Sequence, residues 1–151
     1  MKTVIQRVKQ ACVSSENKLI SKINRGLLVL IGFKQNDTHQ NSEYIIKKIT
    51  NLRIFSDKKN LMDKSIKDLN LEILLVSQFT LYADCKKGNR PSFSKAMPPQ
   101  EAEIFYTEFV HKLKEVYPNI KTGIFGANMN VELINDGPVT IILEKDRKSV
   151  V

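Results

Sequence analysis

Two short, continuously apolar segments constrain the fold of this chain more than any other feature. They occupy residues 27–31 and residues 73–76. Strands that are apolar at consecutive positions are typically covered on both faces. Only two substantial helices are predicted elsewhere, and two helices rarely cover both sides of a sheet, so a second layer of sheet is needed. The sequence therefore predicts one α/β domain over residues 1–151, with layered β/β/α packing of two sheets and two main helices.

The two helices are indicated by their caps and by the spacing of their apolar residues. The first is predicted to begin at a cap formed by Asp37 or Thr38 and to run to about Asn51. The second is predicted to begin at Pro98 and Pro99, because proline is tolerated in the first helical turn. Its core-facing residues then recur at spacings of three and four: Ala102, Phe105, Phe109, Leu113 and Val116.

The other segments predict mainly strands. Before the first helix, we expect a three-stranded meander over residues 2–13, 18–23 and 27–31. After that helix, we expect a short strand at residues 52–55 and a loop or loose hairpin at residues 56–70, where a solvated charged face is the simplest interpretation. The last strands are predicted to begin near Ile120.

The composition combines an ordinary apolar content with an excess of positive charge. Of 151 residues 42% are hydrophobic, and the formal net charge is +8. A basic surface attracts polyanions, although many lysine-rich proteins bind none. No apolar run approaches the ~20 residues of a membrane helix, and the N-terminus lacks the apolar core of a signal peptide. Cys12 and Cys85 form no CxxC pair, which indicates thiols in a reducing cytoplasm, and two histidines exclude a histidine-rich metal site.

Polar residues follow the second apolar strand, at a position where ligands commonly bind. They are Ser77, Gln78, Phe79 and Thr80. A nucleophilic Ser77 or Thr80 would need a base within hydrogen-bond reach. His39 and His111 fall on predicted helices, and no neighbouring pattern indicates a catalytic triad. An enzyme with this site is therefore expected to rely on backbone N–H donors.

A basic loop comes next in the chain. Its positive charges occur without an intervening acid, at Lys86, Lys87, Arg90 and Lys95. Such a loop suits contact with nucleic-acid phosphates, and a solvated run of charge is an equal alternative. Its position directly after the polar strand end favours a nucleic-acid end held beside that site.

A third motif surrounds Phe125 with small residues, over residues 123–129. This arrangement allows a flat ring to lie against backbone, and base stacking is one use of it. A tight bend with a buried phenylalanine is an equal alternative.

The fourth motif is the Gly137-Pro138 pair between two strand-like segments. From spacing alone, a turn between two strands is the favoured interpretation. Glycine also permits close approach, proline lacks an N–H, and a Gly-Pro bond is cis at modest cost, so the pair is also able to present bare carbonyl oxygens to a ligand.

Taken together and in this order, the motifs resemble those of the D-aminoacyl-tRNA deacylase family. The resemblance rests on residues 77–81, 88–93, 126–129 and 135–140, with Gln6-Arg7-Val8 similar to the family's first strand. It extends over essentially the whole chain. It implies a homodimeric cytoplasmic hydrolase without cofactor or metal, which cleaves the ester between a D-amino acid and the terminal adenosine of tRNA, and which also removes mischarged glycine.

The resemblance also implies roles for single residues. Ser77, Gln78, Phe79 and Thr80 of one subunit would face Gly137 and Pro138 of the other, with the Gly-Pro bond cis. The adenosine pocket would include Phe125, Gly126, Ala127 and Met129, and Arg7 would hold the Gly-Pro loop. Lys86, Lys87, Arg90 and Lys95 would contact the tRNA backbone.

The implied mechanism needs little side-chain chemistry, because an aminoacyl ester is already activated. The 2′-hydroxyl of the tRNA assists, and main-chain groups of the protein do the rest. Rigid carbonyl oxygens at Gly137 and Pro138 would exclude L side chains by sterics while D-amino acids and glycine fit. A nucleophilic Thr80 is a minority alternative.

Two other functions remain open from the sequence. One is a non-catalytic nucleic-acid-binding dimer. Some longer relatives are associated with DNA and carry a C-terminal tail. We do not expect such a tail here, because the sequence ends at Val151, soon after the last expected strand. The other is a scaffolding dimer with no preference for charged tRNA.

Overall fold

Strand β1 (Lys2–Ser15) organises the fold, because three other strands pair with it in the computed structural model, which describes residues 1–146. Strand β8 (Asn130–Glu144) runs antiparallel along one edge of β1. The other edge is shared: β3 (Gly26–Gly32) pairs with residues 2–8, and β2 (Lys18–Ile23) pairs with residues 11–15. The expected meander is therefore wrong in its pairing, because β2 and β3 each pair with a different part of the long β1 and no pairing joins β2 to β3 among the described residues.

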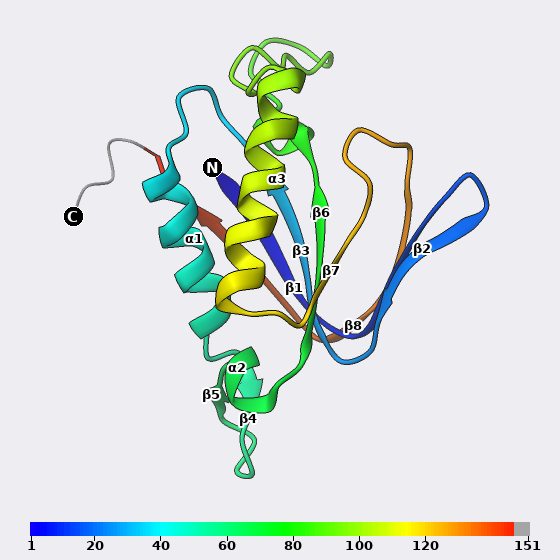
Figure 1. Ribbon diagram of the computed structural model, residues 1–151, viewed down its shortest axis with the longest axis vertical. Helices are drawn as coiled ribbons and strands as arrows, with labels where there is room; N and C mark the ends of the chain where they lie inside the picture. The colour runs from blue at the N-terminus through cyan, green and yellow to red at the C-terminus, as the bar shows by residue number, and fades with distance from the viewer. Residues whose placement is uncertain (147–151) are drawn as a thin grey trace.

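Two parallel strands extend the sheet beyond β3. Strand β6 (Glu72–Ser77) pairs with β3, and β7 (Ile120–Thr122) pairs with β6, so the order is β2-β1-β3-β6-β7. Helix α1 (His39–Asn51) lies on the connection from β3 to β6, and α3 (Pro99–Val116) on the connection from β6 to β7. Both helices cover the same side of the sheet (Figure 1).

The expected helix starts are confirmed. The Thr38 side chain accepts a hydrogen bond from the backbone N–H of Asn41 at the start of α1, and Pro98 precedes α3 with Pro99 at its first position. The short strand expected at residues 52–55 is wrong in its bounds, because β4 spans Phe55–Ser56. It pairs with β5 (Met62–Lys64), so the segment expected as a loop or loose hairpin at residues 56–70 contains a hairpin. Two short helices were not predicted: α2 (Ile66–Leu69) and the 3₁₀ helix η1 (Phe79–Tyr82).

The two apolar strands are covered on both faces, as expected. On β3 and β6, Val29 and Leu75 face the helices in one buried cluster, and Leu28 and Leu74 face the opposite side in another. The second cluster is closed by apolar residues of β2, of the later half of β1 and of the start of β8. Figure 1 shows β1 and β8 continuing from the part of the sheet under the helices into the arm that carries β2. The α/β class is confirmed, and this arm of the six-stranded sheet supplies the second layer.

Residues 135–138 do not form a turn between two strands. Strand β8 is continuous through them, and its pairing with β1 shifts register between Gln6 and Val8 and again between Val8 and Gln10. The turn interpretation is therefore wrong, because the extra residues are absorbed as a bulge in a long strand. The Gly137-Pro138 peptide bond is cis.

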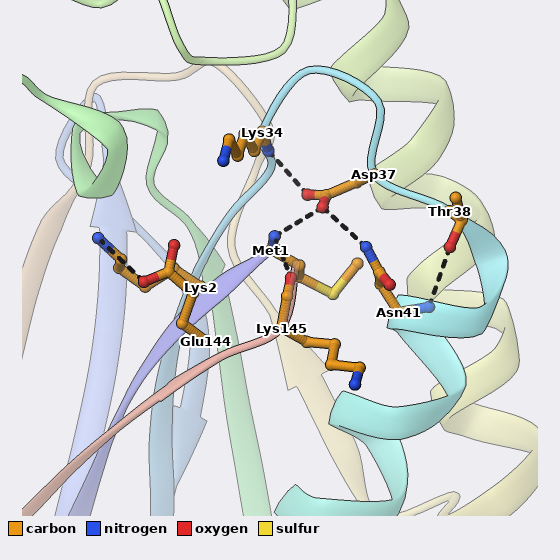
Figure 2. A network of polar contacts seen from close by, with 8 residues as sticks. All are labelled: Met1, Lys2, Lys34, Asp37, Thr38, Asn41, Glu144 and Lys145. Atoms are coloured by element: carbon orange, nitrogen blue, oxygen red, sulfur yellow. Dashed lines mark hydrogen bonds and ion pairs between the residues drawn. The ribbon is translucent and has the colours of Figure 1, made fainter. Parts of the chain in front are cut away.

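The N-terminus is buried at the junction of β1, β8 and α1. The ammonium group of Met1 donates to Asp37 Oδ1 at 2.7 Å and to the carbonyl oxygen of Lys145 at 2.9 Å. Asp37 also accepts from the backbone N–H of Lys34 and from Asn41 Nδ2, at 2.7 and 3.0 Å (Figure 2). These contacts fix the loop between β3 and α1 against the ends of both long strands.

Two findings concern the described residues as a whole. No helix among residues 1–146 is long and apolar enough to cross a membrane. Residues 147–151, the end of the expected domain, lie outside the part that the structure describes.

Candidate active site

A cavity of about 570 Å³ opens where strand β6 ends. Three chain segments that are distant in sequence form its walls: the end of β6 with the start of η1, the segment that leads into α3, and the loop between β7 and β8. The lining residues are Ser77, Gln78, Phe79, Phe93, Ala96, Met97, Pro98, Pro99, Ala102, Phe125, Gly126, Ala127 and Met129.

The first wall is the end of β6 with the start of η1. The backbone N–H of Gln78 donates to Ile31 at 2.7 Å, which ends the pairing of β6, and η1 begins at Phe79. The first intrahelical bond runs from the N–H of Leu81 to Gln78, so the preceding N–H groups, of Phe79 and Thr80, lie at a helix start without intrahelical acceptors. The exposed ring of Phe79 contacts the ring of Phe93 edge to face, with centroids 5.0 Å apart.

The second wall is the loop that carries Phe125. The backbone N–H of Ile124 donates to Met129 Sδ at 3.4 Å, and a Cβ on Gly123 would lie 2.7 Å from that sulfur. A side chain at position 123 would therefore displace the Met129 side chain, and glycine at position 126 suits the backbone φ of +73° there. The half-buried ring of Phe125 lies 5.5 Å from the ring of Tyr106 on α3. The loop is a tight bend and also gives the cavity an aromatic wall.

The cavity offers little side-chain acid or base. Tyr106 lies behind Phe125, and burial raises its pKa to about 12, so the phenol is neutral at physiological pH. His39 and His111 lie outside the cavity and face Glu108 and Glu115 at 3.6 and 3.0 Å. Among residues 1–146, no group of three or more His, Cys, Asp or Glu side chains is placed to hold a metal ion.

Of the four residues expected at the strand end, three line the cavity and Thr80 does not. The hydroxyl of Thr80 instead accepts a hydrogen bond from Gln78 Nε2. The predicted residues of the Phe125 motif all line the cavity. The structure thus brings two of the sequence motifs together across a sheet edge.

The lysines and the arginine of the basic loop do not line the cavity, although Phe93 of the same loop does. Its base is fixed by two backbone hydrogen bonds between Asp84 and Ser92, of 2.7 and 2.9 Å. The backbone N–H of Lys86 donates to the carboxylate of Asp84 and lowers its pKa, and Lys95 acts in the same direction from 3.4 Å. Lys86, Lys87, Arg90 and Lys95 are all exposed.

Gly137 and Pro138 also lie outside the cavity of their own chain, at the bulge opposite Arg7. Arg7 is nine-tenths buried. Its Nε donates to the carbonyl oxygen of Asp136 at 3.0 Å, and its Nη1 donates to that of Ile54 at 2.6 Å. A Cβ on Gly137 would lie 2.9 Å from Arg7 Nη2, so the Arg7 side chain leaves little space for a side chain at position 137.

Several lining residues were not assigned to the site from the sequence. They are Phe93, Ala96, Met97, Pro98, Pro99 and Ala102. Two signals were present: an aromatic residue in the basic loop, and a small residue, Ala102, at the start of an apolar helix face whose other members are large. Neither signal indicates by itself that the start of α3 lies beside the end of β6.

Comparisons with known proteins cover nearly the whole chain. A family model described as D-Tyr-tRNA(Tyr) deacylase matches residues 4–144. A D-aminoacyl-tRNA deacylase of Flavobacterium psychrophilum is 52% identical over 149 residues, 98% of this chain and 99% of the relative. A protein of the same name from Thermosipho africanus is 50% identical over 147 residues, 97% of this chain and 99% of the relative.

Two solved structures are similar as well. A protein described as c-Myc DNA Unwinding Element Binding Protein superposes with a TM-score of 0.92 at 47% identity, over 97% of this chain and 99% of the other. A probable eukaryotic D-amino acid tRNA deacylase superposes with a TM-score of 0.81 over 94% of this chain and 97% of the other, and at 16% identity that likeness concerns the fold alone.

Proposed function

We propose a function from the premise that this chain belongs to the D-aminoacyl-tRNA deacylase family. The cavity hydrolyses the ester bond of D-aminoacyl-tRNA and releases free tRNA and the D-amino acid. The chain is an enzyme, a hydrolase of the aminoacyl-tRNA ester bond. Mischarged glycyl-tRNA is the second substrate of the same site. The activity is a form of chiral proofreading in translation, and a cytoplasmic location follows from the substrate.

The observation that carries this proposal is the meeting of residues 77–79 with residues 125–129 around one cavity. The ring of Phe125, backed by Tyr106, offers a flat apolar wall for the terminal adenine. Ser77, Gln78 and Phe79 on the facing wall lie where the ester attached to the ribose of that adenosine would be held. We assign Gly126, Ala127 and Met129 to the same adenosine pocket.

The chemistry fits a site without catalytic side chains. Ester hydrolysis passes through a tetrahedral intermediate whose negative oxygen needs hydrogen-bond donors. The N–H group of Phe79, a cavity-lining residue at the start of η1, is suited to that task. The 2′-hydroxyl of the terminal ribose assists the attacking water, so the protein contributes position and electrostatic stabilisation.

Selection by handedness is assigned to Gly137 and Pro138 of a second subunit. In a single chain this pair lies outside the cavity, on a strand that pairs only with β1 among the described residues. Ile134 and Ile142 on that strand are 49% and 65% exposed, which is consistent with burial in a homodimer. Carbonyl oxygens of the pair would then exclude an L side chain, and Arg7 would hold the pair in place.

The test combines catalysis with binding. Purified protein is incubated with D-Tyr-tRNA, and ester loss and tRNA retention on a filter are measured in parallel. We expect ester loss with multiple turnovers. The proposal would be contradicted if charged tRNA were retained on the filter while its ester was lost only at the spontaneous rate.

The assignment of Gly137 and Pro138 to a second subunit has its own test. A dimer formed from a Phe125→Ala chain and a Gly137→Ala chain contains one cavity with both motifs intact if the motifs come from different subunits. We expect mixing of the two impaired variants to restore part of the activity that each has lost. Mixtures with no activity, in a sample shown to contain the mixed dimer, would contradict the assignment.

Nucleic-acid binding without hydrolysis is a second candidate. It is favoured by the likeness to the c-Myc DNA Unwinding Element Binding Protein and by the exposed cations of the basic loop. It predicts equal retention of charged and uncharged tRNA on the filter and no turnover, whereas a scaffolding dimer predicts no retention of either.

A further inference from the structure

We propose that a hollow beside the cavity binds a phosphodiester group of the tRNA strand whose 3′ end the cavity receives. This inference rests on the proposed function and adds a site to it. The hollow has a volume of about 350 Å³. Four lysines from three separate segments line it: Lys2, Lys34, Lys86 and Lys95.

The hollow and the cavity share a wall. Phe79, at the start of η1, lines the cavity, whereas Leu81 and Tyr82, at its end, line the hollow. The same division occurs further along the chain, where Lys95 lines the hollow and its neighbour Ala96 lines the cavity. A strand that leaves the cavity across η1 therefore reaches the hollow directly.

The hollow carries an excess of positive charge. Lys95 lies 3.4 Å from Asp84 and Lys2 lies 3.9 Å from Glu144, and both carboxylates line the hollow. These distances exceed the ~2.8 Å of a charge-assisted hydrogen bond. Within residues 1–146, the ammonium groups of Lys34 and Lys86 take part in no ion pair, and the lining has two more lysines than carboxylates.

The remaining wall adds no negative charge. Tyr82 is 5% exposed, and burial together with the carboxylates of Asp37 and Glu144 raises its pKa above the usual value, so the phenol is neutral. Its ring lies 5.0 Å from the Lys2 ammonium. An anion in the hollow would thus meet cations and a neutral phenol rather than a third acid.

The lysines are held on fixed backbone. Lys2 Nζ donates to the carbonyl oxygen of Leu81 at 3.3 Å, which ties it to the end of η1. The backbone of Lys34 is held by Asp37, which also binds the ammonium group of Met1. Figure 2 shows Lys2, Lys34 and Glu144 arriving from three different segments beside this network. The Lys2 ammonium and the backbone that carries Lys34 are therefore positioned before any ligand arrives, which reduces the entropy lost on binding.

The chemistry of the occupant follows from charge and continuity. A nucleic-acid strand carries a phosphate at every nucleotide, and lysines that contact phosphates position the strand without reading its sequence. The hollow adjoins the site assigned to the terminal adenosine, so a phosphate of the nucleotides before that adenosine is the group that reaches it. The hollow thereby holds substrate in register for hydrolysis.

The experiment compares substrates with and without phosphates. Lys34→Ala is assayed with D-Tyr-tRNA and with a D-tyrosyl ester of adenosine, which carries no phosphate. Lys34→Arg keeps the charge. Lys59→Ala is the matched control, because Lys59 is exposed on the turn between β4 and β5, at the opposite end of the molecule in Figure 1.

For D-Tyr-tRNA, we expect Lys34→Ala to raise KM about fivefold with kcat unchanged, and to reduce the slope of log KM against log salt concentration by about 0.7. Lys34→Ala should hydrolyse the adenosine ester with the same KM and kcat as the wild type. Lys34→Arg and Lys59→Ala should have the wild-type KM and kcat on both substrates. A wild-type KM and salt slope for Lys34→Ala would overturn the inference. So would an equal loss on both substrates. If the wild-type protein itself did not hydrolyse D-Tyr-tRNA, the proposed function would be overturned instead.

Discussion

Arg7 Nε donates a 3.0 Å hydrogen bond to the carbonyl oxygen of Asp136, the residue that immediately precedes Gly137. The carboxylate of Asp136 also lies 3.6 Å from that nitrogen. Through Nη1, the same guanidinium binds the carbonyl oxygen of Ile54 at 2.6 Å. One buried side chain therefore connects the bulge of β8 to the segment between α1 and β4.

Replacing Arg7 with alanine removes both connections. Because two carbonyl groups lose a charged donor, we expect the free energy of unfolding to fall by about 1–3 kcal/mol and hydrolysis of D-Tyr-tRNA to fall with it. Urea denaturation and initial rates measure the two effects. Lys18→Ala, at an exposed position of β2, should change the free energy by less than about 0.5 kcal/mol. An Arg7→Ala protein with wild-type stability and rate would contradict the role assigned to Arg7.

Gly137→Ala tests the space at the bulge. The added Cβ would lie 2.9 Å from Arg7 Nη2 and 3.1 Å from Val139 Cγ2, and the backbone φ is +121°. We expect a loss of about 1–3 kcal/mol in stability and at least a tenfold loss of turnover. Gly88→Ala is the matched control, since Gly88 has a φ of +76° but no atom within 4 Å of its added Cβ. Turnover at the wild-type rate by Gly137→Ala would show that the pair does not line a site.

Thr80→Ala distinguishes main-chain catalysis from a nucleophilic hydroxyl. The side chain of Thr80 does not line the cavity, so we expect kcat for D-Tyr-tRNA to stay within about threefold of the wild type. Single-turnover rates at saturating protein provide the measurement. A loss of about 10³-fold or more, which is typical of a removed nucleophile, would refute the assignment to backbone donors.

Phe125→Ala removes the aromatic wall of the cavity. A stacked base contributes about 1–3 kcal/mol, so we expect KM for D-Tyr-tRNA to rise about tenfold or more. Phe125→Leu keeps apolar packing against Tyr106 but cannot stack, and should show most of the same rise. If Phe125→Leu instead has the wild-type KM, the ring serves packing alone.

The carboxyl group of Asp84 predicts a pH effect at the base of the basic loop. Its pKa lies below 3.8 chiefly because the N–H of Lys86 donates to it. A carboxyl with a lower pKa in the folded chain stabilises the fold above its unfolded pKa, and this stabilisation is lost as pH falls through the folded pKa. As pH falls from about 5 to about 3, the free energy of unfolding should therefore decrease more steeply for the wild type than for Asp84→Asn. Urea denaturation at a series of pH values measures both profiles. Parallel profiles would contradict this assignment.

Local patterns in the sequence determine most of the elements. The apolar runs at 27–31 and 73–76 predict strands buried on two sides, and Thr38 and Pro99 mark helix starts, because these signals depend on neighbouring residues alone. The position of β3 beside β1 could not be predicted, since a 14-residue strand is able to accept two partners along one edge and no local rule selects their registers.

The site was predictable only in part for the same reason. Residues 77–79 and 125–129 could each be recognised as motifs, and the resemblance to a family connected them. Lys2 and Lys34 could not be placed beside Lys86 and Lys95 from spacing, because their proximity arises from pairing between distant strands and from the loop fixed by Asp37. The bulge at Gly137 was equally hidden, because a Gly-Pro pair favours a turn unless the partner strand continues past it.

The central claim is hydrolysis that depends on the handedness of the amino acid, and the most direct measurement compares D-Tyr-tRNA with L-Tyr-tRNA at equal concentration. We expect the D ester to be hydrolysed at least about 10²-fold faster than the L ester, which should decay only at its spontaneous rate. Equal rates for the two esters, or no hydrolysis of the D ester, would contradict the account.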